Sequence, residues 1–152
     1  MPRIDIAKAV VRTKSAYPGA LSKITEGREK TVLGDAAGLT QFGVNLTRLK
    51  PGAASAQRHW HEAEDEFVYI VEGEATLVEN GGETILRAGD AAGFKANDPN
   101  GHCLMNKSQR DVVYIEVGTR AVRDRFHYPD VDLAGEKTEA GVRFWAKSSG
   151  AA

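Results

Sequence analysis

Between residues 30 and 118 the chain consists of short runs in which apolar and polar positions alternate. In residues 40–49, Phe42, Val44 and Leu46 alternate with polar or small residues. A period of two is typical of a strand with one buried face, because successive side chains of a strand point to opposite faces. No segment of this region keeps the roughly 3.6-residue apolar period of a helix. The pattern therefore predicts strands.

Two further runs, 66–71 and 111–117, are apolar at both odd and even positions, which is typical of interior strands. The dipeptide Asn80–Gly81 lies between two strand-like runs and is a strong hairpin signal. Glycine, asparagine, aspartate and proline turns separate about eight to ten such strands. Short strands with these turns predict an all-β barrel or sandwich.

The two ends of the chain carry weaker strand and turn signals than residues 30–118. We therefore predict one domain with a central part and two terminal parts. We expect an N-terminal arm (1–29), a barrel core (30–118) and a C-terminal extension (119–152) that packs on the barrel or on a partner subunit. Large apolar residues of the two ends include Tyr17, Phe126, Phe144 and Trp145. A small barrel also exposes sheet edges that need cover. We therefore expect a homodimer in which these arms lie over the partner or across their own barrel.

Composition narrows the class of protein. The chain has 152 residues, of which 41% are hydrophobic and 27% charged, with a formal net charge of −1. These values are ordinary for a globular protein, and without a basic excess we expect no nucleic acid and no membrane partner. No apolar stretch approaches the roughly 20 residues that span a bilayer. The N-terminus lacks a signal-peptide pattern and Cys103 is the single cysteine, so a cytoplasmic location is expected.

The candidate chemistry is concentrated in residues 59–66, His-Trp-His-Glu-Ala-Glu-Asp-Glu. If residues 53–61 form a strand, His59 and His61 share one face, and a turn after them would bring Glu66 back to it. Two imidazoles and a carboxylate on one wall make a first-row transition-metal site. His102 is a further candidate ligand. The alternatives are histidines without a metal, or Glu64 or Asp65 in place of Glu66.

The spacing of these residues resembles the cupin family, whose fold is a double-stranded β-helix, or jelly-roll, barrel. The first cupin motif combines a glycine, His-x-His, a glutamate and a later glycine. The residues that match it are Gly52, His59, His61, Glu66 and Gly73. The second motif is matched by Gly89, His102 and Asn106, although Lys95 and Asn97 replace its usual proline and glycine.

This resemblance implies one divalent transition metal, such as Zn, Ni, Fe or Mn, held by His59, His61, Glu66 and His102. Three neutral nitrogens and one carboxylate would leave about one positive charge on the ion and two open positions in an octahedral shell. Gln57 and Asn106 are candidates for the substrate pocket. The sequence identifies no catalytic residue.

Function remains open at this stage because cupins include several kinds of protein. The favoured expectation is an isomerase-like metalloenzyme that binds a small oxygen-rich ligand, such as a sugar, a sugar phosphate, or a hydroxy or keto acid. An iron-dependent dioxygenase is one alternative. A barrel that binds a small molecule without catalysis is another.

Overall fold

A computed structural model of the chain describes residues 3–151. The first two residues and the last residue of the expected terminal arms lie outside the described residues. The elements in chain order are η1 (Ile6–Lys8), β1 (Val11–Arg12), η2 (Gly19–Thr25), β2 (Arg28–Val32), α1 (Leu33–Ala36), β3 (Phe42–Leu49), β4 (Trp60–His61), β5 (Glu66–Glu72), β6 (Glu74–Glu79), β7 (Gly82–Arg87), β8 (Ala91–Phe94), β9 (Cys103–Met105), β10 (Val112–Thr119), β11 (Asp124–His127), β12 (Ala134–Thr138), β13 (Gly141–Trp145) and η3 (Lys147–Ser149). The all-β prediction is confirmed.

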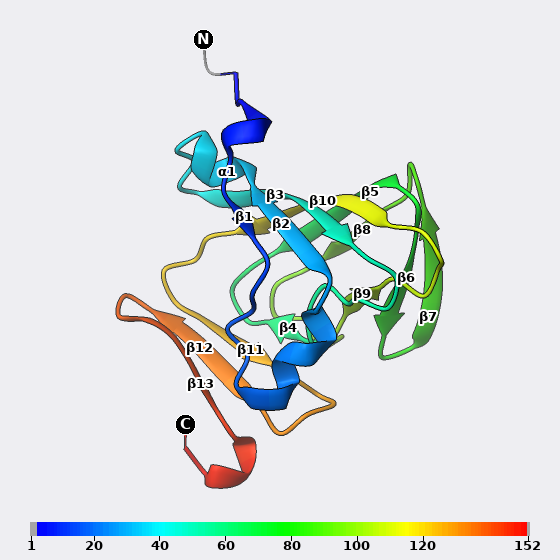
Figure 1. Ribbon diagram of the computed structural model, residues 1–152. Coiled ribbons are helices and arrows are strands. Elements are labelled where there is room, and N and C mark those ends of the chain that lie inside the picture. The colour runs from blue at the N-terminus through cyan, green and yellow to red at the C-terminus, as the bar shows by residue number, and fades with distance from the viewer. Residues whose placement is uncertain (1–2, 152) are drawn as a thin grey trace.

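Two walls of antiparallel strands form the barrel (Figure 1). One wall is a six-stranded sheet with the order β1-β2-β3-β10-β5-β8. The other combines the sheets β7-β6-β9 and β13-β12-β11-β4. Backbone bridges between Ala54 and Met105 and between His59 and His102 connect these two smaller sheets. This arrangement is the double-stranded β-helix that the sequence predicts.

The apolar core lies between the walls and is contributed by both of them. Its buried members are Leu49, Ala53, Val68, Ile70, Ala75, Leu77, Leu86, Leu104, Val112 and Tyr114. Side chains alternate between the two faces of each strand, so the inner face of β3 presents Leu49, Thr47 and Asn45 in turn. On β10, Val112 is followed on the same face by Tyr114 and Glu116. The barrel interior is therefore apolar at one end and polar at the other.

The C-terminal segment adds three strands to the barrel. In Figure 1, β11, β12 and β13 lie together below the main barrel, and β11 pairs with β4. A second apolar cluster fills this region with Phe126, Tyr128 and Leu133, against which Tyr17, Leu21, Val131 and Phe144 pack. Tyr17 of the N-terminal arm and Phe144 of β13 thus meet within one chain, with ring centroids 5.8 Å apart.

Two local predictions have different outcomes. The hairpin at Asn80–Gly81 is confirmed, since β6 and β7 flank these residues and pair with each other. The continuous strand expected over residues 53–61 is wrong: only Trp60–His61 is a strand, preceded by the isolated bridges of Ala54 and His59. The backbone bends at residues 55–58. There the Ser55 carbonyl accepts a hydrogen bond from Arg28 instead of a neighbouring strand.

The run 66–71 forms the interior strand β5, between β10 and β8. Its two apolar faces have different environments. Val68 and Ile70 are buried in the core, whereas Phe67, Tyr69 and Val71 are each more than 40% exposed, at 43%, 42% and 45%. Among the described residues, no helix is long and apolar enough to cross a membrane.

Candidate metal centre

Backbone pairing places the predicted ligands on one patch of the inner surface. The amide of His59 donates to the carbonyl of His102 at 3.1 Å, and the amide of His102 donates to the carbonyl of His59 at 2.9 Å. His61 follows two residues later in β4, and Glu66 opens β5. Residues 62–65 form the reversal between these two strands, as the spacing of His61 and Glu66 predicts.

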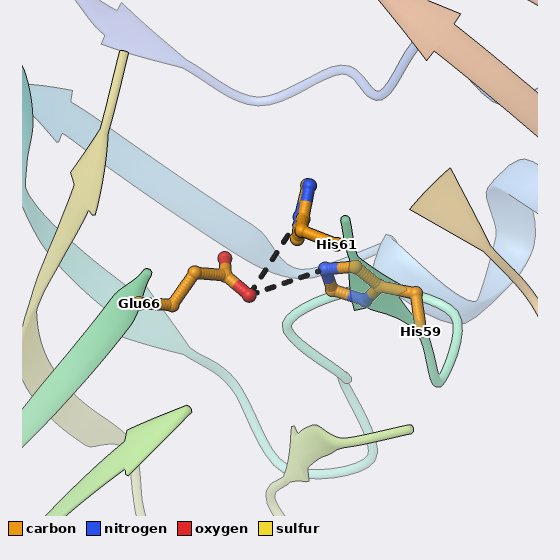
Figure 2. Close-up of side chains that lie close together, drawn as sticks. All are labelled: His59, His61 and Glu66. Carbon is orange, nitrogen blue, oxygen red and sulfur yellow. Dashed lines mark ion pairs between the residues drawn. The ribbon is translucent and has the colours of Figure 1, made fainter. Parts of the chain in front are cut away.

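The carboxylate of Glu66 lies at the centre of the group. Its Oε2 is 2.9 Å from Nε2 of His102 and 3.6 Å from Nε2 of both His59 and His61. Figure 2 shows this oxygen pointing toward the imidazoles of His59 and His61. One ligand atom from each of His59, His61 and Glu66 lies within 4.8 Å of the others, and His102 joins this group through Glu66. The structure brings the four predicted residues together.

Hydrogen bonds orient two of the three imidazoles. Nδ1 of His59 lies 2.8 Å from the carbonyl of Gln57. Nδ1 of His61 lies 2.5 Å from Oδ2 of Asp124. In each case the acceptor selects the tautomer with a proton on Nδ1, so the lone pair is on Nε2, which faces Glu66. His102 is positioned differently: its ring stacks on Phe94 at a centroid distance of 3.5 Å.

The charge states suit a cation. Burial lowers the pKa of His59 to about 4, so its imidazole is neutral at pH 7. Burial would raise the pKa of Glu66, but the hydrogen bond with His102 and the three imidazoles outweigh it and lower the pKa to about 2. For His61, burial lowers the pKa, but the hydrogen bond to Asp124 and the nearby carboxylates together outweigh it, and the net shift is upward. The group therefore offers one ionised oxygen beside neutral nitrogen at His59.

These observations test whether the residues fit a metal. Ligand bonds of about 2.1 Å in an octahedral shell place neighbouring donor atoms about 3 Å apart. The separations of 2.9 and 3.6 Å at Glu66 are close to that value. The set of three imidazoles and one carboxylate is typical of Zn, Ni, Fe and Mn sites. The four residues fit a divalent transition metal with only small side-chain movements.

A second group of potential ligands, His61, Glu64 and Asp124, lies behind the first. It shares His61 through Nδ1, the atom already bonded to Asp124. Lys137 contacts Oε1 of Glu64, and the amide of Ala63 donates to Asp124 at 2.8 Å. Because these contacts already compensate both carboxylates, this group supports the first site rather than forming another.

The cluster forms one wall of a cavity of about 560 Å³. A volume of this size suits a small molecule. Six basic and four acidic side chains line it, together with the three clustered histidines: Arg12, Lys14, Arg28, Lys30, Arg120, Lys137, Asp35, Glu64, Glu66 and Glu116. The lining also includes the aromatic residues Tyr17, Tyr114 and Tyr128. The cavity is polar and has an excess of basic groups.

Comparisons with known proteins agree with this architecture. The family model for the Cupin domain matches residues 45–118. A crystal structure from Silicibacter pomeroyi, described as a sugar phosphate isomerase from a cupin superfamily, is 42% identical to the chain with a TM-score of 0.94. The match covers 97% of this chain and 94% of that one. The chain belongs to the cupin superfamily.

Other cupin structures are similar at greater distance. A putative sugar phosphate isomerase from Acidithiobacillus ferrooxidans is 26% identical, with a TM-score of 0.78 and coverage of 93% of this chain and 86% of that one. A predicted oxalate decarboxylase from Thermotoga maritima is 22% identical, with a TM-score of 0.62 and coverage of 78% and 99%, which shows the shared fold alone. No curated protein matches this cupin.

The two residues expected in the substrate pocket do not line this cavity. The side-chain amide of Gln57 donates to the carbonyl of Leu21 at 2.9 Å. Asn106 is 1% exposed, and its amide nitrogen donates to the carbonyls of Leu49 and Arg110. Both side-chain amides therefore hold neighbouring backbone segments in place. In this structure both side chains have a structural role, and their role in substrate binding stays a prediction.

Several residues of this cupin's site are not evident from the sequence. Asp124 lies beyond the cupin motifs and contacts His61 only because β11 pairs with β4. Glu116 and Arg28 reach the cavity from β10 and β2. Strand alternation signals that Arg28 and Lys30 share a face, but not which face is inside. His127 lies outside the cluster, stacked on Trp60 and 2.7 Å from Glu62.

Proposed function

We propose that this cupin binds one divalent transition metal through His59, His61, Glu66 and His102 and isomerises a small hydroxy-carbonyl compound of the sugar phosphate class. One observation carries the proposal: four convergent donor atoms form the wall of a polar cavity of about 560 Å³. The 42% identity to a structure described as a sugar phosphate isomerase supports the choice of reaction. Hydroxy and keto acids belong to the same substrate chemistry.

The protein side of this chemistry begins with the ligands. Neutral His59 and ionised Glu66 offer their donor atoms at pH 7 without first releasing a proton. The acceptors on His59 and His61 keep the Nε2 lone pairs directed at one point. A bound ion would act as a Lewis acid on a carbonyl or hydroxyl oxygen of the substrate. Its identity among Zn, Ni, Fe and Mn stays open, because affinity for such a site also follows metal availability.

An isomerase also needs a base that moves a proton between neighbouring carbons. Glu66 is occupied as a ligand, so we assign this role to Glu116, which faces the cavity from β10. Gly118, two residues further along β10, pairs with Glu66, so Glu116 lies diagonally beside the cluster. Lys30 contacts Glu116 at 2.5 Å and Asn45 donates to it at 3.0 Å. These contacts hold the carboxylate in place at the cavity wall.

Proton exchange with solvent tests the proposal without knowledge of the exact substrate. The metal-loaded protein is incubated in deuterium oxide with a panel of hydroxyaldehyde and hydroxyketone phosphates, and deuterium at the carbon beside the carbonyl is measured by NMR. We expect exchange with at least one compound. Glu116→Gln should abolish the exchange and keep the metal, whereas Glu72→Gln on the exposed end of β5 should change neither. Exchange at the wild-type rate in Glu116→Gln would exclude Glu116 as the base.

The same preparation separates the alternative functions. The ligand set also suits iron, so oxygen consumption by the iron-loaded protein with a candidate substrate would favour a dioxygenase. Tight binding of a panel compound without exchange or oxygen uptake would favour a barrel that only binds its ligand. A cytoplasmic location stays a prediction from the sequence.

We also propose that the protein is a homodimer. The outer face of the six-stranded sheet carries apolar side chains on three neighbouring strands. Register and alternation place Val44, Leu46, Phe67, Tyr69, Val71, Ile115 and Val117 on it. A continuous apolar face on adjacent strands is typical of an interface. A second copy of the chain offers the same face, and two such faces would bury one another.

A further inference from the structure

Arg28 is a buried cation on the wall of the same cavity. It opens β2, and it shares a face with Lys30 because strand side chains alternate. The residue is 8% exposed and lines the cavity. Its strand neighbour on β3 is Leu49, a core residue that is 0% exposed. The guanidinium therefore lies where the apolar part of the barrel meets the cavity.

Within the described part of the chain, Arg28 has no carboxylate partner. Nη1 donates to the carbonyl of Ser55 at 2.5 Å, and Nε is buried without a hydrogen-bond partner. The other basic residues of the cavity differ in this respect. Lys30 is paired with Glu116, Lys137 with Glu64, and both Arg12 and Arg120 with Asp35. Lys14 is exposed to solvent.

A buried charge without a counter-charge is costly, and proteins keep such groups when a ligand supplies the missing charge. A guanidinium has five N–H donors in one plane, and this fork matches two oxygens of a carboxylate or phosphate. At Arg28 only one donor contact is made by the protein. The remaining donors of Arg28 and the basic excess of the cavity therefore favour an oxyanion.

A second unpaired donor lies near Arg28. Tyr114 lines the cavity from β10 and is 0% exposed. Its hydroxyl lies close to the side chain of Thr47 but makes no hydrogen bond of regular geometry with it. Burial, then Glu116, and more weakly Glu66 raise the pKa of Tyr114, whereas Arg28 and Thr47 lower it. The hydroxyl is therefore within electrostatic reach of both the guanidinium and the carboxylate of the candidate metal centre. Tyr114 links the two ends of the site.

We propose that Arg28, assisted by the Tyr114 hydroxyl, binds the terminal oxyanion of the substrate, a phosphate or a carboxylate. The opposite end of that substrate would then face His59, His61 and Glu66. This inference rests on the proposed function and adds to it the group that distinguishes a sugar phosphate or sugar acid from an uncharged sugar. It assigns the cavity two poles, an oxyanion subsite on β2 and β10 and a metal centre on β4, β5 and β9.

Inorganic phosphate and acetate are the probes, titrated calorimetrically into the metal-loaded protein at constant ionic strength. We expect Arg28→Gln to weaken binding of the preferred anion about 10-fold or more, since it removes a charge-assisted hydrogen-bond pair. Arg28→Lys should retain part of the affinity, because a lysine keeps the charge but not the fork. The matched control Arg48→Gln removes an arginine from the outer face of β3, paired with Asp111, and should bind as wild type.

His102→Ala separates this subsite from the metal. If the anion binds at Arg28, the anion affinity of this metal-depleted variant should stay within about 3-fold of wild type. This difference is smaller than the tenfold change in Kd to which about 1.4 kcal/mol corresponds. Stronger binding of phosphate than of acetate would assign a phosphorylated substrate, and the reverse would assign a sugar acid. Unchanged affinity in Arg28→Gln would overturn the proposal, as would loss of binding in His102→Ala alone.

Folding is checked by circular dichroism, and Tyr114→Phe provides a second variant that keeps the arginine. This change should weaken phosphate binding several-fold and should not perturb the core, because it removes one unpaired hydroxyl. Wild-type affinity in Tyr114→Phe would remove the hydroxyl from the proposal. The two proposals also fail separately. Anion binding that depends on Arg28, without deuterium exchange, would support the subsite and exclude the isomerase. Deuterium exchange together with anion binding that does not depend on Arg28 would support the isomerase and exclude the subsite.

Discussion

Nδ1 of His61 lies 2.5 Å from Oδ2 of Asp124, in a pair that joins the C-terminal extension to the candidate metal centre. The Asp124 side chain is 1% exposed, and its other oxygen accepts a hydrogen bond from the amide of Ala63 at 2.8 Å. Asp124 belongs to β11, which lies outside the residues matched by the Cupin domain model. The extension therefore contributes directly to the orientation and basicity of His61, a proposed metal ligand.

We expect Asp124→Asn to lower the affinity for a divalent transition metal by about 10- to 100-fold, the usual effect of losing a carboxylate behind a histidine ligand. The amide keeps the shape of the side chain but removes the charge that raises the pKa of His61. Competition of the purified protein with a chromophoric chelator measures the affinity directly.

Asp132→Asn is the matched control, because Asp132 bonds to Ser148 at the far end of the extension. It should bind metal as wild type does. Wild-type metal affinity in Asp124→Asn would show that the contact with Asp124 does not affect metal binding by His61.

The contribution of the second ligand-bearing strand is tested by His102. Without this residue the ion would be held by His59, His61 and Glu66 alone. We expect His102→Ala to lower metal affinity by about 10- to 100-fold or more. Mutating a residue that only hydrogen-bonds to a ligand already has an effect of this size, so removing a ligand should cost at least as much. His127→Ala should leave it nearly unchanged, because His127 contacts Glu62 and Trp60 rather than the cluster. Elemental analysis and circular dichroism of both variants make the comparison, and the reverse outcome would exclude the proposed ligand set.

The sequence predicts the fold and the four clustered residues for a physical reason. Motif residues such as Gly73 mark backbone that few other residues adopt. Its φ is +83°, and a Cβ there would lie 2.4 Å from the carbonyl oxygen of Asp111. Such constraints act locally, so spacing reports them. His59 and His61 likewise lie two residues apart, and this short separation determines that their rings meet.

The rest of the site depends on contacts between distant segments, which spacing does not report. Asp124 is 63 residues from His61, and Arg28 is 27 residues from Ser55. Strand alternation places Gln57 on the face of His59 and His61, and Asn106 on the face of His102, yet both side-chain amides bond to backbone carbonyls. Alternation identifies a shared face of a strand, but only the three-dimensional packing decides which face lines the cavity.

The depressed pKa of His59 predicts a pH dependence of stability in the metal-free protein. Burial lowers this pKa from 6.5 to about 4. Between these values the unfolded state binds more protons than the folded state, so the free energy of unfolding should fall as pH falls from 6.5 to about 4. The raised pKa of His61 acts in the opposite direction, but above pH 6.5.

Urea denaturation after chelator treatment measures this slope across the acidic range. His59→Gln removes the titrating group, so its free energy of unfolding should change less between pH 6.5 and about 4 than that of the wild type. His127→Ala is the control, since His127 is on the exposed side of β11 and should retain the wild-type slope. Equal slopes in His59→Gln and wild type would assign the acid sensitivity to other groups.

The exposed apolar face predicts the oligomeric state. Phe67, Tyr69 and Val71 are 43%, 42% and 45% exposed in one chain, although β5 is interior to its sheet. Light scattering at micromolar concentration should therefore give twice the chain mass of 16.4 kDa. Tyr69→Glu places a charge in the centre of this face, where burial without a partner is costly, and should give a 16.4 kDa species. Val142→Glu, at an exposed position on β13, should remain dimeric. A wild-type mass of 16.4 kDa would contradict the dimer.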